Sequence, residues 1–402
     1  MHTVPPTKAA AILACTLIVA GTVLLLSAID LVLPSVPDMP EIFGTTIAHS
    51  QLVIAAFVGG STIGMLIYGS LAAHYGRRRL FIASLATYIV FTVLAIFSPD
   101  IWSLVVLRFL QGAAASGTAA LAPGLIRSLF SELGAMKALS AMGSIEALVP
   151  GLAPLAGAWL HVHYGWTASF TVTAALVTFI CLIIVIRPRL IPSIGTSHNK
   201  AAGGYLKLLK SPTYLRYAMG HACVLGGLLC FVFSAPAIII ETMNGEIHDF
   251  IYMQMTGVTC FIITANISGN LVKRYGVEPI IMAGTLIACM GVLVLLFYSL
   301  IGPNKPEHLL FMFWILNTGL GLRGGPGFVQ ALSASNGDDD RASAILLVAV
   351  TGFAAIATAL VAPFIQYGLI ALSITTCIIV LPSVFLMLFI KPLGYTAPTL
   401  GE

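Results

Sequence analysis

Long apolar runs recur along this chain, and their length limits what the chain can fold into. We find twelve such runs, each of about 20 residues, which is the length that an α-helix needs to cross the hydrocarbon core of a bilayer. With 58% hydrophobic and 8% charged residues, the chain has too little polar surface to cover a water-soluble body of 402 residues. The sequence therefore predicts an all-α integral membrane protein. The approximate runs are 9–33, 50–73, 80–98, 101–126, 138–160, 166–187, 213–240, 249–272, 277–301, 307–332, 342–366 and 368–391.

The Lys and Arg residues predict how these spans are oriented. If the N-terminus is cytoplasmic, the basic residues of the connecting segments fall on the inner side, and Lys305 alone falls outside. Basic loops resist translocation, so this asymmetry predicts a multi-pass protein of the inner (cytoplasmic) membrane with both termini in the cytoplasm. The first run is too long for a signal peptide and lacks a clear cleavage site. The net charge of +4 is then a topology signal, and we expect no nucleic acid partner.

A short motif occurs twice, at an interval of 200 residues. Residues 69–76 and 269–276 share Gly, Leu, Tyr and Gly at matching positions, and each copy follows an apolar run at the equivalent place in its half of the chain. Parallel repeats of this kind are typical of carriers whose halves are related by an axis along the membrane normal. We expect a six-helix bundle at 1–187, a cytoplasmic linker at 188–212 and a second six-helix bundle at 213–402.

The first copy of the motif predicts a tight turn on the cytoplasmic side. Gly69 and Gly76 bracket this turn, where the backbone must bend, and the following Arg77 and Arg78 anchor it at the inner surface. A plain basic loop would explain the arginines but not the Gly-x-Leu-x-x-x-x-Gly spacing that includes Leu71 and is found twice. We interpret the motif as one that serves a conformational change.

Four segments resemble the twelve-span drug:proton antiporters of the major facilitator superfamily, in the bicyclomycin and chloramphenicol resistance branch. The loop signature Gly-x-Leu-Ala-Asp-x-x-Gly-Arg-Arg is matched at 69–78 except at Ala73, where the family usually carries Asp. The similar segments are 30–37, 108–112 and 150–157, which resemble the family's motifs of spans 1, 4 and 5. This resemblance implies the major facilitator fold, two six-helix bundles related by a pseudo-twofold axis along the membrane normal. It also implies that the inner latch at Ala73 is weaker or made differently.

Two acids within the apolar runs are candidates for proton coupling and substrate binding. A proton-coupled carrier needs a carboxylate that takes up and releases a proton as its surroundings change. Asp30 is the first candidate, and the resemblance associates the matching acid with coupling; the alternative is an acid solvated near the outer surface. Glu146 is either a second proton or substrate site or a structural partner of Arg108. The span that carries it includes Pro150, Gly151, Pro154 and Gly157, which permit bending and close packing.

Two arginines also fall within apolar runs, where charge is costly and indicates function. Arg108 is a candidate for proton coupling through a neighbouring acid, or for holding helices together, and the sequence does not separate these roles. Arg323 lies in a Gly- and Pro-rich stretch at 319–327, which predicts a broken helix with a guanidinium that binds an anionic substrate group. The alternative is an Arg that reaches back to the cytoplasmic surface.

The motifs that are missing narrow the function. The sequence has no Gly-x-x-x-x-Gly-Lys-Ser/Thr phosphate loop and no His-Glu-x-x-His metal motif. We therefore expect no bound cofactor or metal, a proton gradient as the energy source, and no enzymatic activity. Our prediction is a monomeric inner-membrane efflux carrier in the lipid bilayer that exchanges protons for a small organic solute by alternating access. The solute is a drug-like compound or a secreted metabolite. Alternatives are an exporter or importer of a siderophore or polycarboxylate metabolite and, less favoured, an intramembrane enzyme.

Overall fold

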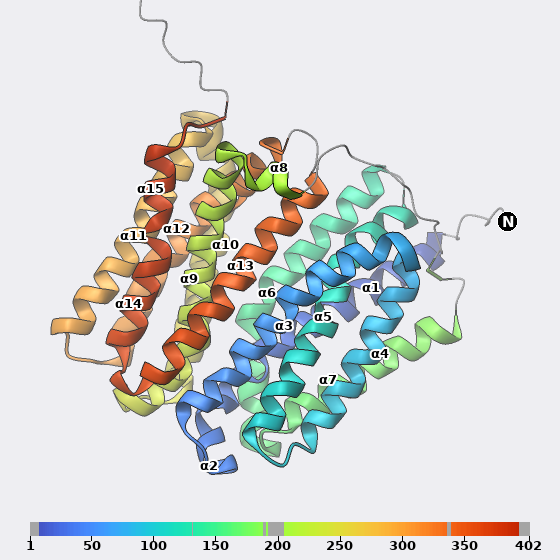
Figure 1. Ribbon diagram of the computed structural model, residues 1–402, viewed down its shortest axis with the longest axis horizontal. Coiled ribbons are helices and arrows are strands. Elements are labelled where there is room, and N and C mark those ends of the chain that lie inside the picture. Colours follow the sequence, from blue (N-terminus) through green and yellow to red (C-terminus); the bar gives the residue numbers. More distant parts are fainter. Residues whose placement is uncertain (1–7, 131, 188–189, 192–204, 336–338, 394–402) are drawn as a thin grey trace, which may run out of the picture. The chain divides into compact units, whose positions relative to one another are not determined.

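The structure is a computed structural model that describes residues 8–130, 132–187, 190–191, 205–335 and 339–393. These residues form fifteen α-helices and two 3-10 helices, and no strand occurs among them (Figure 1). The predicted all-α class is confirmed. The elements are α1 (Lys8–Asp30), η1 (Leu33–Asp38), α2 (Met39–Phe43), α3 (Ile47–Tyr75), α4 (Arg77–Ile96), α5 (Ile101–Leu129), α6 (Glu132–Tyr164), α7 (Ala168–Ile186), α8 (Tyr205–Leu209), α9 (Pro212–Met243), α10 (Ile247–Tyr275), α11 (Val277–Ile301), α12 (Pro306–Ser333), α13 (Asp339–Val361), η2 (Ala362–Tyr367), α14 (Leu369–Val380) and α15 (Pro382–Phe389).

The long helices follow the predicted apolar runs closely. Among the described residues, 11 helical segments are long and apolar enough to cross a membrane. Every predicted run coincides with such a segment except 307–332, which coincides with α12. This helix has 28 residues, but Asn317, Arg323 and several glycines lower its mean hydropathy. The helix α12 is therefore less apolar than the other predicted spans.

Local sequence sets the helix ends. The Thr46 hydroxyl accepts a hydrogen bond from the His49 backbone N–H at 3.4 Å at the start of α3. The Asp100 carboxylate accepts from the backbone N–H groups of Trp102 and Ser103, both at 2.9 Å, and so caps α5. The hydrogen bonds from Ser103, with that from Trp102, hold the pKa of Asp100 below its ordinary value.

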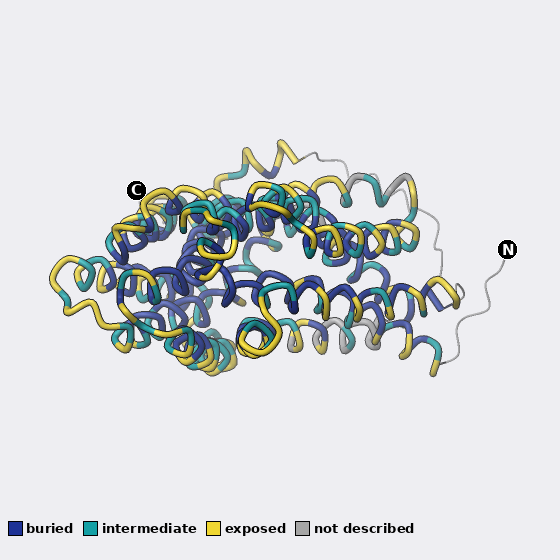
Figure 2. Tube along the Cα trace, turned by 90° about the horizontal axis from the view of Figure 1, so that it is seen from below, coloured by how far each residue is buried: buried dark blue, intermediate teal, exposed yellow. Residues whose placement is uncertain are grey.

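The chain divides into two compact units. The first comprises 1–199, 232–255 and 358–368, and the second comprises 200–231, 256–357 and 369–402. Residues within each unit bury one face of a helix and leave the other face exposed (Figure 2). Most of 188–212 lies outside the described residues, apart from the short helix α8 and its flanks. The predicted boundaries at 1–187, 188–212 and 213–402 stay a prediction.

Glycines bring α3 and α5 into close contact in the first unit. A Cβ at Gly60 would lie 1.9 Å from the carbonyl oxygen of Phe109, and a Cβ at Gly112 would lie 1.9 Å from that of Phe57. A Cβ at Gly64 would lie 2.3 Å from the Ala113 carbonyl oxygen. Small residues allow helices in a membrane to approach until their backbones touch. The Gly112 of the 108–112 motif is therefore explained by packing.

Glycines also bring α11 and α12 into close contact in the second unit. A Cβ at Gly284 would lie 2.7 Å from the Gly319 carbonyl oxygen, and one at Gly319 would lie 2.5 Å from the Ala288 nitrogen. The helix α12 is continuous through 319–327, so the predicted break at Arg323 is wrong. Gly319 and Gly321 of this stretch serve close packing, and Pro326 is accommodated within the helix.

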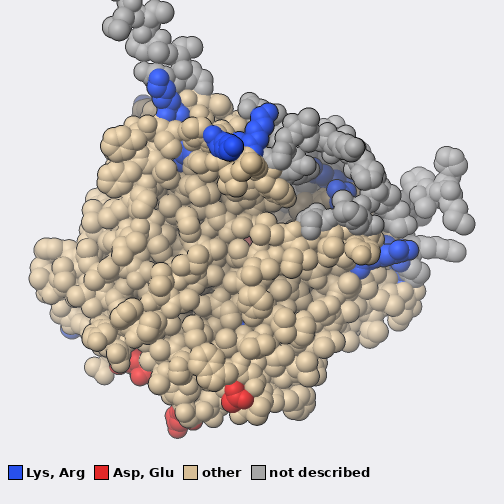
Figure 3. Space-filling model, in the orientation of Figure 1, with Lys and Arg blue, Asp and Glu red and all other residues tan. Residues whose placement is uncertain are grey.

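Several charged residues lie at the ends of α3. Arg77, Arg78 and Arg79 follow this helix, whereas Glu41 precedes it. On the face seen in Figure 3, most of the described surface carries neither basic nor acidic side chains. Basic ends are typical of the cytoplasmic side. Both termini, 1–7 and 394–402, lie outside the described residues.

Candidate functional site

The helix α1 ends at Asp30 for reasons visible in the local sequence. Pro34 has no N–H and so offers no donor to the Asp30 carbonyl. The Val32 N–H turns back to the Ile29 carbonyl at 3.3 Å, which leaves the Ala28 carbonyl without its usual helical donor. The chain then continues into η1, which includes Pro34 and Pro37. The backbone is therefore opened beside Asp30.

Asp30 is buried at this break. Its exposed fraction is 6%. In the part of the chain that the structure describes, its carboxylate forms no hydrogen bond or ion pair. Most of the Asp30 side chain is therefore out of contact with solvent. Asp38, by contrast, is exposed and lies 2.5 Å from Nε2 of His161.

Arg108 is fully buried and holds the opened end of α1. Its Nη1 donates to the Ala28 carbonyl at 3.4 Å and to Oε1 of Gln111 at 2.7 Å, and its Nε donates to the Val53 carbonyl at 3.5 Å. The guanidinium carbon lies 4.2 Å from the centroid of the Phe57 ring. Arg108 thus connects α5 to α1 and α3, and Glu146 is not among these partners. The neighbouring acid that the sequence suggested for Arg108 is replaced here by an amide and two carbonyls.

The contact between Arg108 and Gln111 continues to α4. The Nε2 of Gln111 donates to the Thr92 hydroxyl at 2.7 Å, and this hydroxyl donates to the Tyr88 carbonyl at 2.6 Å. Gln111 and Thr92 are both buried. Sequence reasoning assigned no role to either residue. Gln111 lies in the 108–112 motif, which could have indicated it, whereas nothing in the sequence points to Thr92.

The helix α6 carries Glu146 and the motif at 150–157. It runs unbroken through Pro150 and Pro154, with Gly151 between them, although Pro150 offers no N–H to the Glu146 carbonyl. The Glu146 side chain is half-buried and forms no hydrogen bond or ion pair with a described residue. The structural pair with Arg108 that the sequence left open is not present among the described contacts.

Gly157 fits α6 against the end of α1. A Cβ at this position would lie 2.2 Å from the Leu31 carbonyl oxygen. The Ser169 hydroxyl of α7 donates to the same carbonyl at 3.0 Å. The motif of α6 therefore meets the backbone directly beside Asp30.

The repeated turn motif forms the same backbone in both copies. Gly76 has φ 82° and ψ 138°, and Gly276 has φ 88° and ψ 164°. Such conformations are accessible almost only to glycine. Gly69 lies inside α3, so the turn consists of Gly76 alone rather than the stretch that the two glycines were predicted to bracket. Leu71 is half-buried near the end of the same helix.

The arginines after the first turn differ in their surroundings. The Arg77 side chain crosses Gly124 of α5, where an added Cβ would lie 2.7 Å from Nε of Arg77. Arg77 is exposed and Arg78 is half-buried. The side chain of Ala73 lies outside the described residues, so the latch that it was predicted to weaken stays a prediction.

The second copy of the turn carries an acid where the first carries Arg78. Glu278 accepts from Nη2 of Arg216 at 2.5 Å and from the Tyr217 hydroxyl. Nη1 of Arg216 donates to the carbonyls of Met387 and Ile390 at the end of α15. This ion pair connects α9 and α11 to the end of the last helix.

Arg323 lies in the second unit and is fully buried. Its Nη1 donates to the Gly220 carbonyl of α9 at 2.6 Å. The side chain therefore does not reach the cytoplasmic surface, and that alternative is wrong. Arg108 binds the backbone of α1 two residues before Asp30, whereas the hydrogen bond of Arg323 lies within the second unit.

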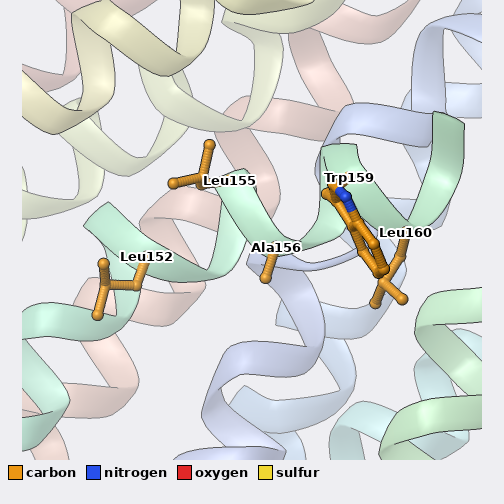
Figure 4. A pocket seen from close by; sticks show the side chains of 5 residues that line it. All are labelled: Leu152, Leu155, Ala156, Trp159 and Leu160. Atoms are coloured by element: carbon orange, nitrogen blue, oxygen red, sulfur yellow. The ribbon is translucent and has the colours of Figure 1, made fainter. Parts of the chain in front are cut away.

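A shallow apolar cavity of about 580 Å³ lies along α6 (Figure 4). The side chains that line this cavity all come from α6 and carry no charge. None of the charged candidate residues lines it. Among the described residues, no group of three or more His, Cys, Asp or Glu side chains is arranged to hold a metal. The lining residues are Leu152, Leu155, Ala156, Trp159 and Leu160.

Comparison with known proteins identifies relatives along most of the chain. The model of the Major Facilitator Superfamily matches residues 18–362. The bicyclomycin resistance protein homolog of Haemophilus influenzae is 23% identical over 76% of this chain and 76% of its own length. The chloramphenicol resistance protein of Pseudomonas aeruginosa is 25% identical over 75% of this chain and 74% of its own length. The predicted relationship is confirmed, at low identity.

A solved structure of the POT family transporter PepTSo has the same fold. It superposes with a TM-score of 0.73 over 93% of this chain and 96% of that one, at 13% identity. The fold and the relatives confirm the prediction of a multi-pass membrane transporter rather than an enzyme. This chain belongs to the Major Facilitator Superfamily.

Proposed function

We propose that this transporter exports small organic solutes across the inner membrane in exchange for protons, and that Asp30 carries the proton. The observation on which this rests is the burial of Asp30, whose carboxylate forms no hydrogen bond or ion pair with a described residue. An ionised carboxylate without a partner is costly in an apolar interior. A carboxyl group at this position is more stable in its protonated form. This preference is lost when the group meets water or a cation.

The contacts of Arg108 support a positioning role. By donating to the Ala28 carbonyl, Arg108 stabilises the opened end of α1 two residues before Asp30. The amide of Gln111 orients the guanidinium from the other side. Arg108 thereby controls the surroundings of Asp30 and takes part in proton coupling without itself carrying the proton.

We assign Glu146 to the same task as a second acid. Its half-buried side chain has no partner among the described residues, which favours titration or contact with solute over a structural pair. Pro150 removes the donor that would otherwise complete the helix at the Glu146 carbonyl. The backbone of α6 is therefore free to bend at Glu146, as a helix that alternates between two conformations requires.

The named relatives indicate the class of solute with which to begin. Their names refer to resistance to bicyclomycin and chloramphenicol, so we propose a drug-like, uncharged solute for the export cycle. The glycine turns at Gly76 and Gly276 would permit the helices on either side to move in alternating access. We further propose that the chain acts as a monomer, with the basic helix ends and both termini in the cytoplasm.

The test is flux of chloramphenicol in proteoliposomes under an imposed pH gradient. We expect accumulation driven by the gradient with the unaltered protein. The Asp30→Asn variant should lose this response but retain exchange of labelled for unlabelled chloramphenicol, because exchange needs no net proton movement. Glu41→Gln removes an exposed acid of the adjacent helix α2 and is the matched control. An unchanged gradient response in Asp30→Asn would exclude Asp30 as the proton site.

A further inference from the structure

Arg323 is a buried cation with unused hydrogen-bonding capacity. Its exposed fraction is 0%, and its one hydrogen bond to a described residue joins Nη1 to the Gly220 carbonyl at 2.6 Å. Nε and Nη2 are both buried and have no hydrogen-bond partner among the described residues. Two donors of a guanidinium are therefore left unsatisfied inside the bundle, at a cost that native structures normally avoid.

The positions of Nε and Nη2 of Arg323 determine which chemical group they can bind. Nε and Nη2 lie on one edge of the guanidinium, where their N–H bonds run parallel. This edge binds a carboxylate through two parallel hydrogen bonds, one to each oxygen. The remaining nitrogen, Nη1, is the one that fixes the group to α9. The side chain is thus anchored at one corner and has no hydrogen-bond partner along the edge that recognises a carboxylate.

The charge around Arg323 is not balanced by the protein. No carboxylate of the described residues forms an ion pair with it. The ionisable groups in electrostatic range are the thiols of Cys223 and Cys289 and the imidazole of His221. A buried charge without a counter-ion is strongly destabilising. An anion is therefore the missing partner.

Glycines lie beside the Arg323 side chain. A Cβ at Gly324 would meet only the Cε1 of His221, at 3.9 Å, and a Cβ at Gly327 would meet Nη2 of Arg323 at 3.7 Å. The Nδ1 of His221 is buried and has no described hydrogen-bond partner. Two glycines of α12 thus lie close to two unsatisfied polar side chains.

Arg108 uses more of its hydrogen-bonding capacity than Arg323 does. Its Nε donates to the Val53 carbonyl, and its Nη1 donates to an amide and a carbonyl, whereas its Nη2 has no described partner. One of the two nitrogens on the carboxylate-binding edge of Arg108 is therefore in use, whereas both are without a partner in Arg323.

We propose that Arg323 and His221 form a binding site for a carboxylate group. Arg323 binds its two oxygens through Nε and Nη2, and the imidazole of His221 donates to one of them. This inference rests on the proposed function in one respect, since it extends the transported solutes to organic acids. A free inorganic anion is the other source of the same charge, and the experiment separates the two.

The binding test uses purified full-length protein and sodium acetate as the probe. Thermal unfolding is followed with acetate, sodium chloride or acetamide at equal concentration. We expect acetate alone to raise the unfolding temperature with saturation. Arg323→Lys keeps the charge but lacks the parallel edge, and we expect its apparent affinity for acetate to fall about tenfold. Arg79→Lys, at an exposed arginine, is the control and should retain the acetate response.

Each other outcome contradicts the proposal. An equal effect of chloride would show a halide site, and an unchanged acetate affinity in Arg323→Lys would place the binding elsewhere. If Arg323→Lys does not fold, His221→Leu serves as the second variant, because the loss of one donor should also weaken acetate binding. Full acetate affinity in His221→Leu would remove His221 from the site.

The transport test compares succinate with succinamide in proteoliposomes. Flux of succinate alone would support a transported carboxylate, whereas binding without flux would overturn the assignment of the solute class. The acetate response requires neither a membrane nor a gradient. If the pH gradient fails to drive chloramphenicol while acetate still binds through Arg323, the proposed function falls and this site stands. If the pH gradient drives chloramphenicol while acetate does not bind through Arg323, this site falls and the proposed function stands.

Discussion

Gly157 of α6 touches the backbone of Leu31, since a Cβ at Gly157 would lie 2.2 Å from the Leu31 carbonyl oxygen. This contact fixes the distance between α6 and the opened end of α1. Asp30 is the adjacent residue. The packing of one glycine therefore determines how tightly the proposed proton site is closed.

Substitution of Gly157 tests this relationship. We expect Gly157→Ala to force α1 and α6 apart, to cost about 1–3 kcal/mol as overpacking does, and to reduce flux driven by a pH gradient. Thermal unfolding and flux in proteoliposomes measure the two effects. Gly143→Ala is the matched control, because a Cβ at Gly143 in the same helix meets nothing within 4 Å. Equal behaviour of the two variants would show that the close contact has no consequence.

The amide of Gln111 is predicted to orient Arg108. Gln111→Leu leaves Nη1 of Arg108 without its acceptor at 2.7 Å. We expect a loss of stability of about 1.5–3 kcal/mol, the range for hydrogen bonds to charged groups, together with loss of the gradient response. Thr92→Val removes the next member of the network, and we expect a smaller effect because Arg108 keeps its partner. A larger loss of stability in Thr92→Val than in Gln111→Leu would contradict this order.

The backbone at Gly76 is predicted to tolerate only glycine. We expect Gly76→Asn to destabilise the fold by about 1–3 kcal/mol, since φ 82° and ψ 138° are strained for any side chain. Gly44 provides the comparison. Its φ of 59° and ψ of 43° lie in the left-handed helical region, which Asn adopts readily, so Gly44→Asn should unfold at nearly the unaltered temperature.

The cap at Asp100 predicts a dependence of stability on pH. Because the Ser103 hydrogen bonds lower the pKa of Asp100 in the folded protein, its contribution is complete above the unfolded pKa, about 3.9. The contribution is lost as pH falls through the lower folded pKa. We expect the difference in unfolding temperature between the unaltered protein and Asp100→Ala to be constant near neutral pH and to shrink in acid. A difference independent of pH down to strongly acidic conditions would contradict this.

The sequence predicted the spans well because apolar runs of bilayer length leave little choice. The run at 277–301 coincides with α11, whereas α1 ends at Asp30, before the predicted end of the run at 9–33, because Pro34 withdraws a donor. The charged residues at Asp30, Arg108 and Arg323 could be selected from the sequence alone. Their burial followed from the cost of charge in a bilayer.

The features that the sequence did not predict depend on contacts with neighbouring helices. The stretch around Arg323 was expected to break α12, because glycine and proline weaken an isolated helix. Within a bundle, Gly284 of α11 packs against Gly319 and supports the same residues as a continuous helix. The contact of Gln111 with Thr92 joins two helices and leaves no trace in the spacing of either. Side-chain partners across helices are set by helix rotation, which apolar runs do not encode.

The two copies of the glycine turn have similar backbone conformations but opposite charges at one equivalent position. At the equivalent position, one copy carries Arg78 and the other carries Glu278, which is bonded to Arg216 and so to the end of α15. The two turns therefore differ in their contacts. The first is followed by the exposed Arg77, a position suited to contact with anionic lipid headgroups, whereas the second is linked through Glu278 and Arg216 to the end of the last helix.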